Sequence, residues 1–488
     1  MKKRILTLVA ALAAAALLAA CGDKPPAVTT TDTSAGDTSV TDADTLGIPE
    51  TADYGGEAFN ILSAGNVAYA DFTADETAST PLDSAQYKRK ALVEQNYGVK
   101  IAETVEKAYS SGGGPGYKRL STDANAGDCN FDLALVAGYD VTVLAYSDYL
   151  YDLASIPGID LSKSWWDKRA NENLAVRGVM FFTTGEITVS DNDVAFVILF
   201  NKELRKAYDL DDPYSLVYDG EWTLDTFGAL CKTVTEDLDQ NGIMDANDRF
   251  GVLVWDDSVV GIVNAAGQRC CTIAEDGTIG LTLYNETTLA ALDKYFSIIY
   301  DTQYALTYQR EKVDPLEMWQ ADKGLFWMNT MTRIPQLRGM ESDFGILPYP
   351  KLNAEQQDYY TTVAPYNSQF VCVPLIQKDI ERTGIITEAL AYYGKQIVTP
   401  AYYDVNLVGQ STRDEESADM LEIIFDNLVF DIGYYYQVGP YNKQLIRMVQ
   451  ERDTNFTSMY DSYKTSAERL LTVINTYYAK AVSGWEKQ

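Results

Sequence analysis

In the first part of the chain, short apolar runs alternate with segments in which apolar residues recur at helical spacing. Residues 57–63 alternate apolar and polar positions, which predicts a strand. From Pro81 the apolar residues recur at helical spacing until Gly98, and a second strand is expected over residues 99–103. Residues 131–137 are almost wholly apolar, as is typical of a buried parallel strand. Strand, helix and strand in alternation predict an α/β fold.

The second part of the chain continues this pattern. Thr223 is a good helix N-cap, and Trp222 before it and Phe227 after it have the spacing of a hydrophobic staple. From Thr387 onward the spacing is mainly helical. Further apolar runs predict strands over residues 195–200, 249–255, 324–329, 344–350 and 370–374. Because a chain of this length is too long for one small core, two domains are expected.

A basic and then apolar segment begins the chain. Basic residues at positions 2–4 precede an apolar run over residues 5–20, and the run ends in the motif LAAC at 18–21. This pattern predicts an export signal over residues 1–20 and lipid attachment to Cys21. The alternative is an ordinary signal peptide with a chance cysteine.

The segment after this signal has the composition of a tether. Residues 21–53 contain no aromatic residue and are rich in Thr, Asp, Ser and Ala, so they bury too little apolar surface to offset their ordering entropy. We therefore expect a disordered tether over residues 21–53. The folded part is expected to begin near Tyr54 and to run to about Gln488.

Composition restricts the classes of function. The formal net charge is −31, and such a surface repels nucleic acid and anionic lipid. The chain contains no histidine, which removes the commonest general base and most zinc sites. The sequence contains no Gly-x-Ser-x-Gly elbow or Walker loop. We expect a binding protein rather than an enzyme, although 70 acidic residues leave a two-carboxylate hydrolase open. Apart from Cys21, the cysteines are expected to be small core residues, because an odd number at irregular spacing is no disulfide framework.

The stretch DLDQNGIMDAND at residues 237–248 has the register of a calcium-binding loop. Gly242 stands at position 6, where such a loop turns sharply, and Asp248 stands at position 12, where the longer Glu is usual. The expected calcium ligands are the side chains of Asp237, Asp239, Asn241, Asp245 and Asp248 and the carbonyl of Ile243. The alternative is an exposed turn with Asx caps. A helix is predicted before the loop and a strand after it, so calcium is expected to brace the fold rather than to act as a switch.

Six motifs follow one another along the chain. They are LAAC at 18–21, FNKEL at 200–204, GEWTLDTF at 220–227, GLFWMNT at 324–330, FGILPYPK at 344–351 and YYDVNLVGQSTRDEESADMLEIIFDNLVFDIG at 402–433. In this order they resemble the family 1 extracellular solute-binding proteins of bacterial ABC importers, the maltose-binding-protein-like group. The resemblance implies a two-lobed periplasmic-binding-protein type II fold, with a hinge and an interlobe cleft. It implies that lobe one comprises residues 54–192 and 323–362, and lobe two residues 193–322 and 363–488.

The resemblance also implies a function. A lipoprotein of this family, held by its lipid on the extracytoplasmic face of the cell membrane, captures a carbohydrate and delivers it to the permease subunits of the importer. An oligosaccharide is the expected ligand, and peptides, amino-sugar polymers and polyols remain alternatives. An exported glycan-active hydrolase and a calcium-dependent cell-surface adhesin are the alternative functions.

Candidate ligand residues are aromatic or polar residues at predicted strand ends and turns. Sugars present C–H patches that stack on aromatic rings, and hydroxyl groups that bond to polar side chains. Two adjacent tryptophans are not expected to share one core, so one of them is expected to face the cleft. For each polar residue, a loop cap is the alternative. The candidates are Trp165, Trp166, Trp255, Asp256, Tyr139, Asp140, Asn66, Asp191 and Asn329.

Overall fold

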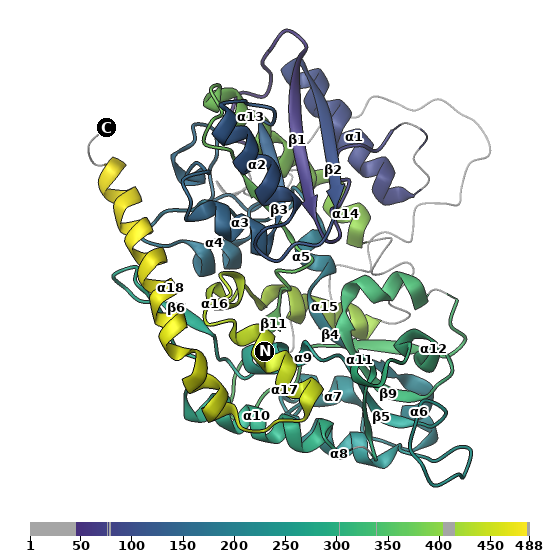
Figure 1. The fold of residues 1–488 in the computed structure, drawn as a ribbon. Helices are drawn as coiled ribbons and strands as arrows, with labels where there is room; N and C mark the ends of the chain where they lie inside the picture. The colour runs from purple at the N-terminus through teal and green to yellow at the C-terminus, as the bar shows by residue number, and fades with distance from the viewer. Residues whose placement is uncertain are drawn as a thin grey trace, which may run out of the picture. The chain divides into compact units, whose positions relative to one another are not determined.

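The computed structural model describes residues 45–75, 77, 80–301, 303–337, 339–403 and 415–485, which belong to one compact unit spanning Asp42–Gln488 (Figure 1). The predicted export signal over residues 1–20 and the predicted lipidation site at Cys21 lie outside the described residues. Among the described helices, none combines the length and the apolar character that crossing a membrane requires.

The ordered fold begins before Tyr54. Ile48 is 8% exposed and packs in the hydrophobic core. The phenol of Tyr97 donates a hydrogen bond to the carbonyl of Pro49 at 2.9 Å. Residues 45–53 therefore pack against the first helix, and the tether predicted over residues 21–53 is wrong at its C-terminal end. The buried side chain of Ile48 removes enough apolar surface from water to order this segment, although the segment contains no aromatic residue.

The first sheet has the strand order β12-β3-β1-β2, in which β1, β2 and β3 are parallel and β12 is antiparallel. The apolar side chains that predicted these strands fill its core. Thr80 and Asp83 close a capping box at the start of α1, and Gly98 ends this helix with a left-handed φ of 60°. The strands are β1 (Glu57–Gly65), β2 (Val99–Lys107), β3 (Leu133–Ala137) and β12 (Gln369–Cys372). The helices of this part are α1 (Pro81–Tyr97), α2 (Pro115–Ala126), α3 (Gly138–Ala145), α4 (Lys168–Leu174), α5 (Ser190–Asp193), α13 (Ile380–Tyr393) and α14 (Thr399–Tyr402) (Figure 1).

The second sheet has the strand order β10-β4-β9-β5-β8. The predicted staple before α8 is present, because the rings of Trp222 and Phe227 are 5.8 Å apart and Thr223 caps the helix. The strands are β4 (Phe196–Asn201), β5 (Phe250–Val254), β8 (Ala305–Thr307), β9 (Gly324–Thr330) and β10 (Phe344–Leu347). The helices of this part are α6 (Lys202–Ala207), α7 (Pro213–Tyr218), α8 (Leu224–Thr233), α9 (Ser258–Ala265), α10 (Glu286–Ile299), α11 (Tyr308–Glu311) and α12 (Pro315–Gln320).

Both sheets are built on one plan. In each sheet all strands share one direction except one, which the chain supplies as it crosses from the other sheet. The first crossing is β4, which follows α5, and the second is β12, which comes after β10 and the short strand β11 (Thr361–Thr362). Two short pairs complete the strands: β11 with β13 (Leu428–Val429), and β6 (Cys271–Ile273) with β7 (Ile279–Leu281).

The strand pairing corrects the ranges expected for the two lobes. Within residues 323–362, β9 and β10 pair in the second sheet and not in the first. Within residues 363–488, β12 pairs with β3 in the first sheet. Each of these strands is buried along its whole length and mostly apolar, so its sequence carries no mark of the sheet that it joins. The strands β9 and β10 therefore belong to the lobe of the second sheet and β12 to the lobe of the first, which is the reverse of the expected assignment.

The C-terminal helices pack on both parts. They are α15 (Glu415–Asp426), α16 (Ile432–Tyr435), α17 (Tyr441–Glu451) and α18 (Phe456–Trp485). Asn475 on α18 pairs with both the N–H (2.8 Å) and the carbonyl (2.9 Å) of Ile279 in β7. Further along α18, the Tyr478 ring lies 5.3 Å from the ring of Phe181. Phe181 stands two residues before Thr183, which pairs with a strand of the first sheet. Figure 1 shows α18 in yellow, running past both sheets.

Four of the five cysteines predicted to lie in the core are buried. Cys231, Cys270, Cys271 and Cys372 are buried, whereas Cys129 is exposed. Cys129 follows α2 in the loop before β3, where the chain returns over the surface. All five are free thiols.

Candidate ligand-binding site

Four side chains lie near one another at strand ends of both sheets: Tyr109, Tyr139, Tyr366 and Asp257. Together with Trp255, which stands two residues before Asp257, we call them the tyrosine–aspartate cluster. Tyr109 follows β2 and Tyr139 lies in the first turn of α3, whereas Trp255 and Asp257 lie between β5 and α9. Tyr366 lies in the segment that returns the chain to the first sheet. The Tyr366 ring centroid is 6.0 Å from that of Tyr109 and 6.5 Å from that of Tyr139, both in edge-to-face geometry.

The charge of Asp257, from the second sheet, acts on two tyrosines of the first part of the cluster. Burial raises the pKa of Tyr139, and the charge of Asp257 raises this pKa further. Burial likewise raises the pKa of Tyr366, with Tyr109 and Asp257 adding to the effect. The pKa of Asp257 is itself well above its usual range, because of burial and of the neighbouring Asp256 carboxylate. The cluster therefore places phenols and carboxylates together in a partly dehydrated environment.

Part of this cluster is open to solvent. Tyr109 is 70% exposed, whereas Tyr366, Trp255 and Asp257 are partly exposed. The Trp255 ring packs on that of Phe196, with centroids 4.9 Å apart. An exposed ring can stack on the C–H face of a sugar while carboxylates beside it accept hydrogen bonds from hydroxyl groups. The arrangement therefore suits a polyhydroxylated ligand.

Two of the predicted ligand residues form hydrogen bonds to the backbone beside the cluster. The Asn66 amide donates to the carbonyl of Tyr366 (2.7 Å) and exchanges hydrogen bonds with the N–H (3.0 Å) and carbonyl (3.2 Å) of Ser110. Asp140 is fully buried and accepts hydrogen bonds from two N–H groups within residues 112–114, at 3.0 and 2.9 Å. Both side chains are therefore occupied by the loop that carries Tyr109.

Three other predicted residues near the cluster are buried. Asp256 is 3% exposed and accepts a short hydrogen bond from the Gln450 amide. Asn329, 4% exposed, donates to the phenol of Tyr308 at 2.9 Å. Tyr139, which belongs to the cluster itself, is 5% exposed, and its phenol accepts a hydrogen bond from the Asn442 amide at 2.9 Å. In this arrangement these residues shape the surroundings of the cluster rather than its exposed surface.

The adjacent tryptophans share one core. Trp165 is 1% and Trp166 is 3% exposed, so the expectation that the two rings cannot pack together is wrong. Their indole N–H groups donate to the two oxygens of Glu388, at 3.0 and 2.9 Å. Burial raises the pKa of Glu388 to about 7. A shared buried acceptor on α13 thus satisfies both polar atoms, and sequence spacing carries no sign of such a distant partner.

Trp166 and Asp191 lie at a different place. Both line a cavity of about 820 Å³ between α4, α5 and the end of α15, and this lining includes no member of the cluster. Asp191 is 4% exposed and accepts a hydrogen bond from the Thr184 hydroxyl at 3.1 Å. Burial and the carboxylate of Asp167 hold the pKa of Asp191 well above its usual range. The structure therefore divides the predicted ligand residues between two locations.

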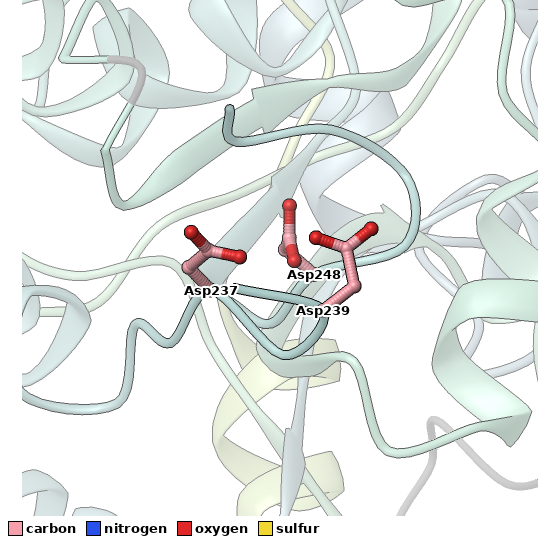
Figure 2. A group of neighbouring side chains, drawn as sticks. All are labelled: Asp237, Asp239 and Asp248. Atoms are coloured by element: carbon pink, nitrogen blue, oxygen red, sulfur yellow. The ribbon is translucent and has the colours of Figure 1, made fainter. Parts of the chain in front are cut away.

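The acidic loop lies between α8 and β5, as predicted. Figure 2 shows Asp237, Asp239 and Asp248 turned toward a common point, and one oxygen of each lies within 4.8 Å of the others. Asp248 is fully buried. One Asp237 oxygen accepts the N–H of Gly242 (2.8 Å), and the other is buried without a hydrogen-bond partner among the described residues. Three carboxylates are therefore aimed at the same small space, and one of them carries a buried oxygen without a partner among the described residues.

The remaining predicted metal residues form turns within the loop. Asn241 accepts the N–H of Ile243 at 2.7 Å, and Asp245 accepts the N–H of Asn247 at 2.8 Å. Asp248 accepts the N–H groups of Leu238 (2.9 Å) and Asp245 (2.8 Å). Each carboxylate or amide oxygen has two lone pairs, so these turns leave acceptor capacity for a cation. The loop combines Asx turns with converging carboxylates.

Sequence reasoning did not identify three members of the cluster. Tyr109, Tyr366 and Asp257 are each next to a feature that it did use, because Tyr109 follows a predicted strand and Asp257 follows Trp255-Asp256. The chain contains 34 tyrosines, so residue type alone does not select two of them. The signal available for Tyr109 was its position just past a strand end. Tyr366 lies far along the chain and meets the others only through the crossing of the backbone.

No family model matches this chain, and no curated protein matches it. Solved structures do match. The galacto-N-biose-/lacto-N-biose I-binding protein of the ABC transporter from Bifidobacterium longum, in complex with lacto-N-biose, is 13% identical with a TM-score of 0.58, and the match covers 86% of this chain and 98% of that one.

Two further solved structures match in the same way. The cyclic alpha-maltosyl-1,6-maltose binding protein from Arthrobacter globiformis is 13% identical, with a TM-score of 0.57 and coverage of 86% of this chain and 99% of that one. An ABC substrate-binding protein from Listeria monocytogenes, in complex with cycloalternan, is 13% identical, with a TM-score of 0.54 and coverage of 86% and 99%. At these identities the likeness shows the fold. The chain therefore has the two-lobed α/β fold that the sequence resemblance implied.

Proposed function

We propose that this chain is the substrate-binding subunit of an ABC importer and that it binds a carbohydrate at the tyrosine–aspartate cluster. The observation that carries this proposal is the exposed ring of Tyr109 beside phenols and a carboxylate, at strand ends of both sheets. In open α/β sheets, ligands bind outside the carboxyl ends of the strands. The matching structures named above are described as sugar-binding or substrate-binding proteins, which supports the proposal.

The proposal includes capture and delivery, and no chemical step on the sugar. Ligand binding stabilises one arrangement of the two lobes, and permease subunits in the membrane recognise that arrangement. The motif LAAC supports a lipid on Cys21 that holds the protein on the extracytoplasmic face of the membrane. Mass spectrometry of the N-terminal peptide from membrane fractions tests the lipid, since an unmodified Cys21 contradicts this part.

A thermal-shift screen with mono- and oligosaccharides tests the function. A sugar at a hundred times its Kd stabilises the folded protein by about 2.7 kcal/mol, which raises the melting temperature by several degrees. Chromatography of the incubated sugar distinguishes binding from hydrolysis. An intact sugar with a raised melting temperature supports the proposal, whereas a released product supports an exported hydrolase. No shift with any carbohydrate contradicts carbohydrate binding.

Replacing Tyr109 with alanine is expected to weaken binding of the sugar found in that screen by roughly tenfold, because an aromatic face contributes about 1 kcal/mol or more to such a contact. Isothermal titration calorimetry measures the change. Tyr284→Ala is the matched control, because Tyr284 is also exposed (42%) but stacks on Phe456 away from the cluster. Equal losses in the two variants would contradict the assignment of Tyr109.

We also propose that the acidic loop binds calcium as a structural ion. Asp237, Asp239 and Asp248 converge within 4.8 Å, and one buried Asp237 oxygen has no donor among the described residues. Calcium accepts six or more oxygen ligands in a flexible cage, which suits carboxylates with the carbonyl of Ile243 nearby in sequence. Bound calcium offsets the repulsion among these carboxylates and braces the connection between α8 and β5.

Removing calcium with a chelator is expected to lower the melting temperature by several degrees, because the ion binds only the folded loop. Affinity for sugar at low temperature is expected to stay within about twofold, since the loop holds no member of the cluster. Asp239→Ala is expected to abolish the chelator effect. Asp276→Ala is the control, because Asp276 forms an exposed Asx turn with Thr278 (2.8 Å) outside the loop. Lost sugar binding with an intact fold would instead support a calcium-dependent ligand site or adhesin.

A further inference from the structure

We propose that Asp140 is a positioning residue, which holds the loop carrying Tyr109 in place and does not itself touch the ligand. This inference rests on the proposed function. Its starting point is the contrast between two neighbours in the fold: Tyr109 is 70% exposed, whereas Asp140 is fully buried. A buried carboxylate can act on a ligand at the surface only through the group that it holds.

The Asp140 carboxylate organises a glycine-rich turn. One of its oxygens accepts the N–H groups of Gly112 (3.0 Å) and Gly114 (2.9 Å). Gly114 fits closely around it, because a Cβ at this position would lie 2.6 Å from the other Asp140 oxygen and 2.7 Å from the Cα of Ser110. Glycine is therefore required where the loop wraps the carboxylate, and the loop geometry follows the position of this single side chain.

Contacts from other elements hold the same loop. The N–H of Ala108 donates to the carbonyl of Gly65 at 3.1 Å. The Asn66 side chain bonds to both backbone groups of Ser110. From the segment after α16, the amide of Gln437 donates to the carbonyl of Ser111 at 3.3 Å. The backbone on both sides of Tyr109 is thus fixed while its ring stays exposed.

This arrangement has a consequence for binding. A loop that is already ordered does not lose further conformational entropy when its aromatic ring stacks on a ligand. If the anchor is removed, the loop samples several conformations and the ligand must select one of them. Loss of Asp140 is therefore expected to weaken binding without removing any ligand contact.

Substitution of Asp140 by asparagine distinguishes a positioning role from direct contact with the ligand. An asparagine side chain retains one oxygen that can accept both glycine N–H groups. Its amide nitrogen would replace the other Asp140 oxygen, which is buried and has no hydrogen-bond partner among the described residues. Asp140→Asn is therefore expected to keep the loop and to bind sugar within about threefold of the natural chain.

A double-mutant cycle tests the inference. Asp140→Ala is expected to raise the Kd roughly tenfold in the natural chain but by less than twofold in the Tyr109→Ala background, since its effect passes through that ring. Asp152→Ala is the matched control, because Asp152 is also buried and accepts two backbone N–H groups, from Ala154 (3.3 Å) and Met180 (2.7 Å). This control is expected to lower stability and to leave the Kd unchanged.

Two outcomes of the binding measurements overturn the inference: equal losses from Asp140→Ala in both backgrounds, or a full loss of binding in Asp140→Asn, because each indicates direct contact. Gln437→Ala, which releases the loop from the other side, provides a second cycle if Asp140→Ala does not fold. Hydrogen exchange of the peptide over residues 108–116 is a readout that needs no ligand. Faster exchange there in Asp140→Ala supports the loop anchor even if no sugar binds, whereas unchanged exchange overturns it.

Discussion

Asp431→Ala is expected to lower the free energy of unfolding by roughly 3–5 kcal/mol, because several buried donors lose a charged acceptor at once. Asp431 is 3% exposed. One oxygen accepts the N–H of Cys270 (2.6 Å) and the amide of Asn264 (3.2 Å). The other accepts the N–H groups of Gly433 (3.0 Å) and Tyr434 (3.3 Å) at the start of α16.

Urea unfolding measures this loss as a lower midpoint with an unchanged slope. Asp453→Ala is the matched control, because Asp453 also accepts a backbone N–H (Asn455, 2.8 Å) but is exposed, so about 1 kcal/mol or less is expected. Asp431→Asn is expected to fall between the two, since an amide offers a single acceptor oxygen. A loss below about 1 kcal/mol in Asp431→Ala would show that the surroundings relax enough to bond these donors in other ways.

The second large effect is a decline in stability as the pH rises. The pKa of Glu388 is about 7 in the folded protein, raised by burial from 4.5, and the N–H of Asp160 and both indole N–H groups face the carboxylate. Between pH 4.5 and 7 the folded state therefore holds a proton that the unfolded state has released. The stability that this provides is complete below about pH 4.5 and is lost above about pH 7, a change of roughly 3 kcal/mol.

Other buried acids also lower the free energy of unfolding as the pH rises. One of them is Asp193, because burial raises its pKa to about 6. The contribution of Glu388 is therefore isolated by comparison with Glu388→Gln. The difference in unfolding free energy between the two chains is expected to change by about 3 kcal/mol from pH 4.5 to pH 8. Tryptophan emission is expected to change over the same range only when Glu388 is present, since Trp165 and Trp166 both donate to it. A pH-independent difference would contradict the raised pKa.

Local features of the fold were predictable from sequence. The strand starting at Glu57, the helix between Thr80 and Gly98 and the cap at Thr223 all depend on residues close together in the chain. The partners of β9, β10 and β12 were not predictable, because these strands are buried on both faces and mostly apolar, without an alternation that would mark a partner. Sequence patterns thus identify elements, whereas pairing depends on contacts between distant segments.

The candidate site shows the same division. The positions after β1, β3 and β5 were predicted to lie near a ligand, and Asn66, Tyr139 and Trp255 do lie at or beside the tyrosine–aspartate cluster. Their individual roles were not predictable, because whether a polar side chain faces a ligand or holds a loop depends on its burial. Asp140 has the residue type of a ligand contact and the surroundings of an anchor.

The crossing strands also affect the order in which the two halves can be completed as the chain emerges from synthesis or export. All five strands of the second sheet lie in one uninterrupted stretch, from β4 to β10. The first sheet needs β12, whose Gln369 pairs with Ala137, 232 positions earlier (369 − 137). Until β12 arrives, the edge of β3 is open to pairing with other chains. The sheet that begins the chain is therefore completed last, and its unpaired edge is a point at which a stalled or truncated chain is prone to aggregate.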